Sequence, residues 1–458
     1  MADPRLIVIG AGPAGVRAAE AIVKAGLRPI LIDEGRRDGG QIYRRQPDGF
    51  RRPSSALYGT EASRAEDLHR TFDQLKPQID YRPGHLAWNV ADGEIHTVAD
   101  GVAEAFPFDA LIIASGATDR LMPVKGWQMA GVYSLGAAQI ALKHQACAIG
   151  SAVVFMGTGP LLQLVARQYQ KAGANVVALL DAAPFAAQAR ALPKLASRPG
   201  TLLKGLRLVA GLTLSGLPIH RGVTPLEIDG DPDHGVRGVT VRLASGAEKR
   251  FACDAVGLGY HLRPETQLAD LAGCPVAFDE ATRQFWPEAD EDGRSGVPGV
   301  YLAGDGARTQ GADGAEITGE LAALSALADL GRAAPATRIQ ELRARRQTME
   351  RFRIGLTEAY PWPHHLAAAL PDDAVLCRCE GVTVGELREV AREKGADEVN
   401  RAKAFSRVGM GRCQGRYCGH AAAEVVAAAT GLPLREIGRL RGQAPVKPLL
   451  LGTRKAPS

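Results

Sequence analysis

The chain is 458 residues long, with 46% hydrophobic and 23% charged residues and 53 glycines. This balance excludes a disordered or fibrous protein, and the length predicts about three domains. The net charge is only +5, and the basic residues are scattered rather than gathered in a stripe with aromatic residues, so we expect no nucleic-acid partner.

The sequence also bears on location. No apolar run reaches the length of a transmembrane helix, and no basic and apolar leader precedes the first expected strand. The seven cysteines are odd in number, and Cys147, Cys253 and Cys274 are isolated in sequence. This argues against a secreted disulfide framework and predicts a reducing, cytoplasmic location, with these three as buried structural thiols.

Residues 5–33 have the order strand, glycine turn, helix, strand that binds a dinucleotide. Gly10 would make the tight turn, Gly12 would let the backbone approach a pyrophosphate, and Gly15 would let the helix pack on the strand. The helix amides would then face the anion. Such a motif alone also fits an ordinary glycine-rich turn, but a second strand ending in an acidic pair completes the fingerprint. The candidate residues are Gly10, Gly12, Pro13, Ala14, Gly15, Asp33 and Glu34.

Three later segments extend this site. Gly39-Gly40-Gln41 follows the second strand, the apolar strand 110–114 runs into Ser115-Gly116, and Gly304-Asp305 follows much later in the chain. Together they resemble the two-dinucleotide-binding flavoprotein family. That resemblance implies FAD, with Asp305 binding the flavin ribitol, and it adds these candidates: Gly40, Gln41, Ser115, Gly116, Gly304 and Asp305.

The pattern repeats between these segments, where the family carries an NAD(P)H domain. Strand 152–156, the turn Gly157-Thr158-Gly159 and strand 174–180 ending at Asp181 form the second site. Leu162 replaces its third glycine, so we expect the helix to be pushed off the strand or the pyrophosphate to lie differently. Asp181 still offers a ribose ligand. A retained fold with a lost or altered ligand and a working NAD site both remain open.

Four cysteines dominate the C-terminal part, as C-x-C at Cys377 and Cys379 and C-x4-C at Cys413 and Cys418. Four thiolates hold either an iron–sulfur cluster or zinc. A capping box at 383–386 predicts a helix ending at Gly395, and further helices are expected at 397–407 and 421–429. Arginines adjoin the thiols, and some of them are expected to be solvated; these are Arg378, Arg412 and Arg416.

This C-terminal unit resembles the bacterioferritin-associated-ferredoxin-like [2Fe–2S] domain in its cysteine spacing, its capping-box helix and its Gly-Met-Gly lead-in. The order of units along the whole chain is similar to that of the A (α) subunits of bacterial opine oxidases and dehydrogenases, and of subunits of hydrogen cyanide synthase and of proline or hydroxyproline dehydrogenases. The resemblance implies FAD, a [2Fe–2S] cluster and a heteromer with an FAD-containing, amine-oxidising β subunit. A small third subunit, NAD or ATP in the second unit, and FMN at a subunit interface remain open.

The expected fold is α/β, a two-dinucleotide-binding, Rossmann-like flavoprotein with an inserted NAD(P)-type domain and a small helical [2Fe–2S] domain. We expect an FAD unit at 1–120 and 290–345, an inserted degenerate unit at 121–289, an extended linker at 346–371 with exposed His364 and His365, a ferredoxin-like unit at 372–440 and a tail at 441–458.

The leading functional hypothesis is an electron-transfer subunit that relays electrons through FAD and the cluster to an unknown acceptor. The sequence nominates no catalytic residue, because no histidine has a convincing partner by spacing. Disulfide-reductase chemistry is not expected, because no C-x2-C or C-x4-C pair lies in the first 376 residues. The alternatives are a self-sufficient NAD(P)H-dependent reductase and a nucleotide-sensing assembly subunit.

Overall fold

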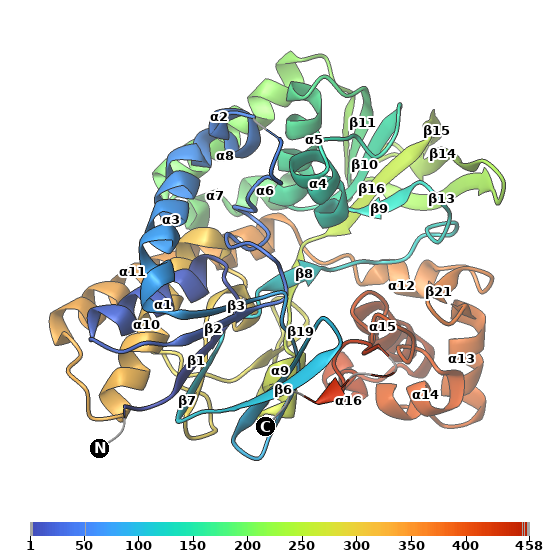
Figure 1. Ribbon diagram of the computed structural model, residues 1–458. Helices are drawn as coiled ribbons and strands as arrows, with labels where there is room; N and C mark the ends of the chain where they lie inside the picture. The colour runs from blue at the N-terminus through green and yellow to red at the C-terminus, as the bar shows by residue number, and fades with distance from the viewer. Residues whose placement is uncertain (1–2, 51, 451, 453, 456–458) are drawn as a thin grey trace.

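The computed structural model describes residues 3–50, 52–450, 452 and 454–455. The expected FAD unit therefore has residues 1–2 and 51 outside the described part, and the expected tail has 451, 453 and 456–458 outside it. A first α/β unit, a second α/β unit and a helical C-terminal unit lie against one another (Figure 1).

The first unit is built on a five-stranded parallel sheet. Its central strands are uninterrupted apolar runs because both faces of the sheet are covered. Helices α1, α3 and α10 cover one face, and a small antiparallel sheet with α9 covers the other. In sheet order the strands are β20 (Val300–Leu302), β7 (Ala110–Ile113), β1 (Leu6–Ile9), β2 (Ile30–Asp33) and β3 (Asp80–Pro83).

The covering elements of this unit come from distant parts of the chain. The helices are α1 (Pro13–Lys24), α2 (Ser54–Tyr58), α3 (Ala62–Leu75), α9 (Gln267–Leu271) and α10 (Gly311–Asp329), with short 3-10 turns at Gly59–Glu61, Lys76–Gln78 and Gly304–Gly306. The antiparallel sheet consists of β4 (Leu86–Ala91), β5 (Glu94–Ala99) and β6 (Val102–Pro107), and β23 (Arg454–Lys455) pairs with β6 in parallel.

The second unit is inserted between the two halves of the first through the antiparallel pair β8 (Ala117–Asp119) and β17 (Leu262–Pro264). It repeats the parallel-sheet plan, with helices on one face and an antiparallel sheet on the other. Its parallel strands in sheet order are β12 (Ile219–Arg221), β11 (Val176–Asp181), β10 (Val153–Thr158), β16 (Ala255–Tyr260) and β9 (Val132–Ser134).

Helices α4 and α5 pack on this second sheet, and α6 to α8 follow β11. The helices are α4 (Leu135–His144), α5 (Pro160–Lys171), α6 (Phe185–Arg190), α7 (Leu192–Leu195) and α8 (Pro199–Leu214). The antiparallel strands are β13 (Thr224–Asp231), β14 (Gly235–Arg242) and β15 (Glu248–Ala252), and the hairpin β18 (Val276–Asp279) and β19 (Gln284–Pro287) returns the chain to the first unit.

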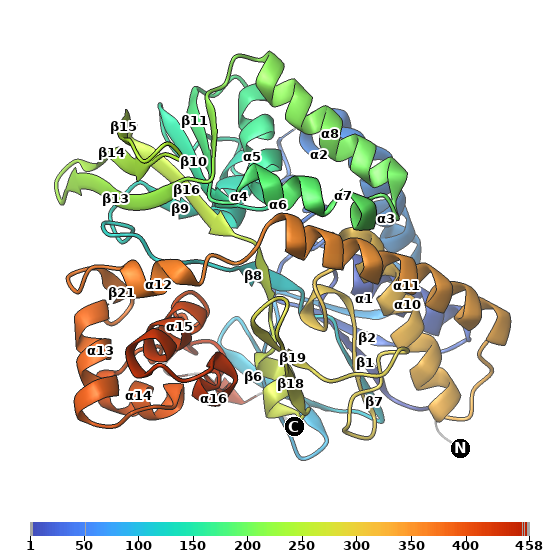
Figure 2. The same ribbon diagram turned by 180° about the vertical axis from the view of Figure 1, so that it is seen from behind.

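The expected extended linker is wrong. Helix α11 (Ala336–Ala359) continues through most of it, and α12 (His365–Ala369) follows after a short break (Figure 2). Met349 and Phe352 are buried against neighbouring helices, and this tertiary packing keeps the segment helical up to the prolines. His364 and His365 are exposed, as expected.

The C-terminal unit is a small helical bundle whose core is continuous with that of the second unit. It contains β21 (Val375–Cys377), β22 (Val382–Thr383), α13 (Val384–Glu393), α14 (Val399–Ser406), α15 (Gly419–Thr430) and α16 (Leu434–Ile437). The three expected helices are confirmed, including the capping box of α13 and the left-handed Gly431 that ends α15. Within the described residues, no helix is both long and apolar enough to span a membrane.

Candidate cofactor sites

The first glycine turn is packed so closely that side chains are excluded from it. Gly10 has φ +101°, and a Cβ there would lie 2.4 Å from the Ala114 carbonyl oxygen. A Cβ on Gly15 would meet the Gly10 carbonyl oxygen at 1.7 Å, and one on Gly40 would meet the Gly12 Cα at 2.9 Å. The turn therefore presents bare backbone at the start of α1, the arrangement that binds a pyrophosphate.

The acidic pair that ends β2 is divided between two tasks. The Asp33 carboxylate accepts hydrogen bonds from the Ala11 and Gly35 amides, so it braces the glycine turn. Burial is the largest influence on Asp33 and raises its pKa. Glu34 is exposed and forms an ion pair with Lys447 from the C-terminal part of the chain. Both carboxylates line the same cavity, and the ribose contact stays a prediction.

Asp305 lies on the opposite side of this turn, at the start of a loop that leads into α10. Its Oδ1 accepts hydrogen bonds from the amides of Gln310 at 2.8 Å and Gly311 at 2.9 Å. Burial raises the pKa of Asp305. The carboxylate is thus held by backbone groups at the cavity wall, as a ligand for sugar hydroxyls would be.

A cavity of about 2350 Å³ joins these residues. It is lined by nearly all of the expected first-site residues, by the N-terminal part of α5 and by the cysteine loop at Cys413. Gly15 does not line it, since that glycine packs beneath the turn. The cavity exceeds the usual size of a small-molecule site, and the backbone turn and Asp305 at its wall fit FAD.

The second glycine turn differs from the first in its backbone. Gly12, before α1, has φ −79°, whereas its counterpart Gly159, before α5, has φ +104°. Leu162 is fully buried in a core that also contains Phe155 of β10, so the helix stays packed on the sheet. The expectation that the helix leaves the strand is therefore wrong, and the altered turn is the consequence of the larger side chain.

Asp181 has no role at the cavity wall. Its carboxylate accepts hydrogen bonds from the Thr158 hydroxyl at 2.7 Å, the Ala183 amide at 2.9 Å and the Gln188 side chain at 3.2 Å. Burial raises its pKa to about 6. Gly157, Gly159 and Asp181 are all absent from the cavity lining. The protein thus satisfies the carboxylate that a ribose would need.

Tyr360, beyond α11, covers this second site. Its hydroxyl accepts a hydrogen bond from Gln163 of α5 at 3.3 Å, and its carbonyl oxygen contacts the ring of His261. Burial raises the pKa of Tyr360 to about 12, and the nearby Asp181 carboxylate raises it further. No sequence signal points to this contact, because Tyr360 lies almost two hundred positions from the turn.

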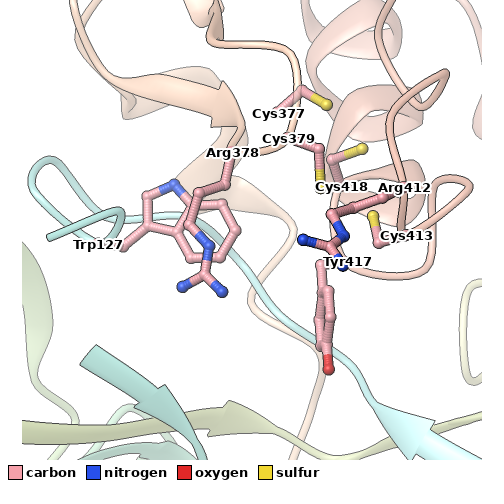
Figure 3. A pocket seen from close by; sticks show the side chains of 8 residues that line it. All are labelled: Trp127, Cys377, Arg378, Cys379, Arg412, Cys413, Tyr417 and Cys418. Atoms are coloured by element: carbon pink, nitrogen blue, oxygen red, sulfur yellow. The ribbon is translucent and has the colours of Figure 1, made fainter. Parts of the chain in front are cut away.

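The four C-terminal cysteines converge although they come from two segments (Figure 3). The sulfur of Cys418 lies within hydrogen-bonding reach of those of Cys377 and Cys413, and Cys379 contacts Cys413. Cys418 immediately precedes α15, and Cys377 ends β21.

Backbone amides favour the thiolate form at two of these positions. Contact with Cys418, followed by amides of Gly409 and Glu380, lowers the pKa of Cys377 to about 6. Contact with Cys418, together with amides of Tyr417 and Gly415, lowers the pKa of Cys413 to about 5. Amides directed at thiolate sulfur suit an anionic iron–sulfur core.

A cavity of about 370 Å³ lies in front of these thiols. Trp127 of the second unit and Tyr417 line it, with Arg378 placed 5.5 Å from the Trp127 ring centre. Arg378 and Arg412 are exposed, as expected for some of the arginines, but Arg416 is largely buried. Sequence reasoning misses Trp127, since nothing in the sequence connects it with the cysteines.

Two sequence expectations about other side chains are wrong. Cys147 is exposed, whereas Cys253 and Cys274 are buried as expected. Two histidines do have carboxylate partners: His85 lies 3.2 Å from Glu104, and His234 lies 2.9 Å from Asp231. Among the described residues, no three His, Cys, Asp or Glu side chains are arranged to hold a single metal ion.

Fold and site together define a two-dinucleotide-binding flavoprotein with an appended cluster domain. Residues 4–319 match the family described as pyridine nucleotide-disulphide oxidoreductase, and residues 375–428 match the BFD-like [2Fe–2S] binding domain. These families imply FAD and a [2Fe–2S] cluster, and the second match favours the cluster over zinc. The chain belongs to the pyridine nucleotide-disulphide oxidoreductase family.

Individual relatives narrow this class. The chain is 36% identical to the opine oxidase A (α) chain of Rhizobium meliloti over 97% of its own length and 86% of the relative's. It is 32% identical to hydrogen cyanide synthase subunit HcnB of Pseudomonas aeruginosa, over 97% of each. It therefore belongs with these oxidoreductase subunits. The structure of L-proline dehydrogenase from P. horikoshii has the same fold, with a TM-score of 0.74, 20% identity and coverage of 98% of this chain and 79% of that one.

Proposed function

We propose that this chain is the electron-transfer subunit of a heteromeric, FAD-dependent dehydrogenase of opines, secondary amines or amino acids. One observation supports this most strongly: a single cavity extends from the FAD-type glycine turn to Cys413 of the thiol cluster. The relatives are named as subunits of opine oxidase and of hydrogen cyanide synthase, and these names support both the oxidoreductase class and the existence of partner subunits.

Each part of the proposed relay has its own residues. The bare turn at Gly10 and Gly12 and the first amides of α1 would hold the FAD pyrophosphate, and Asp305 would accept hydrogen bonds from the ribitol. The four cysteines would hold the cluster. When bound, FAD takes up two electrons and the cluster carries one, so the pair divides a two-electron oxidation into single steps.

Amine oxidation itself is assigned to a partner, an FAD-containing β subunit. The pocket residues of the first site are committed to holding a dinucleotide, and we nominate no base for proton removal from a substrate. A cytoplasmic location agrees with four free thiolates that must meet iron before they oxidise.

The first experiment is cofactor analysis of the anaerobically purified chain. We expect FAD, iron and acid-labile sulfide, and a paramagnetic signal after reduction with dithionite. Cys418→Ser should lose the iron and the signal, because Cys418 contacts two of the other three thiols. Cys147→Ser, at an exposed and isolated cysteine, is the control and should keep both. Absence of iron and sulfide from the parent chain would refute the proposal.

A second experiment separates the relay from its alternatives. The isolated chain should not be reduced by amines or opines, and reduction should appear when the co-purified partner subunits are restored. Rapid bleaching of the flavin by NADH in the isolated chain would instead identify a self-sufficient reductase. Tight binding of ATP or NAD with no absorbance change would indicate a nucleotide-sensing subunit. The altered second turn and the internal bonding of Asp181 favour neither alternative.

A further inference from the structure

Glu265 is fixed to the wall of the first site. It follows β17, one of the two strands that connect the first and second units. Its amide donates to the Gly116 carbonyl at 2.9 Å, and its own carbonyl accepts from the Ser115 hydroxyl at 2.7 Å. Ser115 and Gly116 are expected FAD-site residues, and all three residues line the large cavity.

The side chain of Glu265 extends to the cysteine loop. Arg416 donates to the two carboxylate oxygens, from Nε at 2.7 Å and from Nη2 at 3.2 Å. The remaining guanidinium nitrogen of Arg416 donates to the carbonyl oxygens of Cys413 at 3.3 Å and Val446 at 2.8 Å. A continuous series of hydrogen bonds therefore joins Ser115 and Gly116 to the backbone of a cluster ligand.

These charges are largely removed from water. The side chains of Arg416 and Arg263 are 10% exposed and that of Glu265 is 16% exposed. Arg263 lies 3.7 Å from Glu265, so two cations share one carboxylate. The group thus carries one excess positive charge beside thiols whose cluster would have a charge of about −2 oxidised and about −3 reduced. At low effective dielectric, that excess favours the reduced cluster.

We propose that Glu265 and Arg416 are positioning residues that couple the FAD-type site to the cluster. This rests on the proposed function, since it presupposes both cofactors. Arg416 holds the cysteine loop against the Ser115–Gly116 wall, and the pair of opposite charges sets how readily the cluster accepts an electron. Removal of the cation should make reduction harder, and removal of the anion should make it easier.

The test is a potentiometric titration of the full-length, cofactor-loaded chain, in which the cluster is followed by its paramagnetic signal and the flavin by its absorbance. Arg416→Gln should shift the partition of electrons from cluster to flavin, and Glu265→Gln should shift it the opposite way. Each shift should be on the order of tenfold, as expected for one unit charge at an effective dielectric constant of about 20. Arg435→Gln, at an exposed arginine of the same unit, is the control and should leave the partition unchanged.

Two further results decide the interpretation. Arg416→Lys keeps the charge but not the two-pronged contact, so it should keep the partition near that of the parent while slowing electron transfer from flavin to cluster. If Arg416→Gln loses its cluster, Arg416→Lys and Glu265→Gln still carry the test. Equal partition in parent and Glu265→Gln would overturn this inference alone, whereas a parent chain without a cluster would overturn the proposed function.

Discussion

At the scale of single residues, the three aspartates that end glycine-motif strands or loops show why residue type alone does not define a role. The sequence treats Asp33, Asp181 and Asp305 as sugar ligands. In the structure Asp33 braces its own turn, Asp181 is satisfied internally, and only Asp305 is held by backbone amides at a cavity wall without side-chain partners among the described residues. Their hydrogen-bond partners lie on neighbouring loops, so the fingerprint does not separate them.

Asp305→Asn should weaken FAD binding. The amide can still accept from the Gln310 and Gly311 amides, so the loop should persist, but the charged acceptor for the ribitol is lost. A hydrogen bond to a charged group contributes about 1.5–3 kcal/mol, so the dissociation constant should rise by roughly 10- to 150-fold. Titration of the apoprotein with FAD, followed by flavin fluorescence, measures it. Asp109→Asn, at an exposed ion pair with Arg5, should bind FAD as the parent does.

Asp181 should make stability depend on pH in the direction opposite to most carboxylates. Burial raises its pKa in the folded chain to about 6, above the ordinary 3.8. The folded state therefore holds this proton more tightly than the unfolded state, and stability falls as the pH rises from about 4 to 6. Asp181→Asn removes this dependence. Relative to the parent, the variant should gain about 3 kcal/mol between pH 4 and pH 7.

Denaturant unfolding of both chains at the two pH values checks this. Asp109→Asn provides the opposite sign, because hydrogen bonds from the Arg5 amide lower the pKa of Asp109 and its stabilising effect is present at neutral pH and lost in acid. An Asp181→Asn variant that behaves like Asp109→Asn would contradict the assignment.

At the scale of elements, the sequence is informative wherever the signal is local. The glycine turn, the capping box of α13 and the glycine that ends α15 can all be placed from neighbouring residues, because caps and left-handed positions act within a few residues. The connector is harder to predict, because its Pro-rich end suggests extended chain over residues that α11 keeps helical by burying Met349 and Phe352. That burial depends on helices far away in sequence.

Thr383→Ala should destabilise the cluster unit by about 1 kcal/mol. The Thr383 hydroxyl accepts from the Glu386 amide at 3.2 Å, and the Glu386 carboxylate accepts from the Thr383 amide at 2.6 Å, so both halves of the cap are present. The helix begins close to Cys377 and Cys379, and its fraying should speed loss of iron to a chelator. Thr348→Ala, at an exposed position inside α11, changes the same side chain away from a cap and should release iron at the parent rate.

At the scale of the whole molecule, the cluster unit is held on the flavoprotein body by side chains from widely separated segments. Glu424 of α15 accepts from Arg283 through both oxygens, at 2.9 and 2.6 Å, and from the Trp362 indole at 3.0 Å. The buried Arg120 stacks on Trp362 at 3.7 Å. Arg439 forms a two-pronged contact with Asp270 beside them. Spacing along the chain could not have predicted this docking, since each partner lies more than sixty positions from the other.

Glu424 should therefore control whether the cluster unit stays docked. Its side chain is 3% exposed, so Glu424→Gln leaves Arg283 and Arg120 without their buried counter-charge and should cost about 3 kcal/mol. Glu424→Ala also removes the acceptor of the Trp362 indole and should cost more. The connector between α11 and α12, protected in the parent, should become the first site of limited proteolysis, with release of an iron-containing C-terminal fragment. Glu280→Gln, at an exposed glutamate paired with Arg435, is the matched control and should be cleaved like the parent. Equal cleavage of Glu424→Gln and Glu280→Gln would mean that apolar packing alone, and not this buried charge network, holds the cluster against the flavin site.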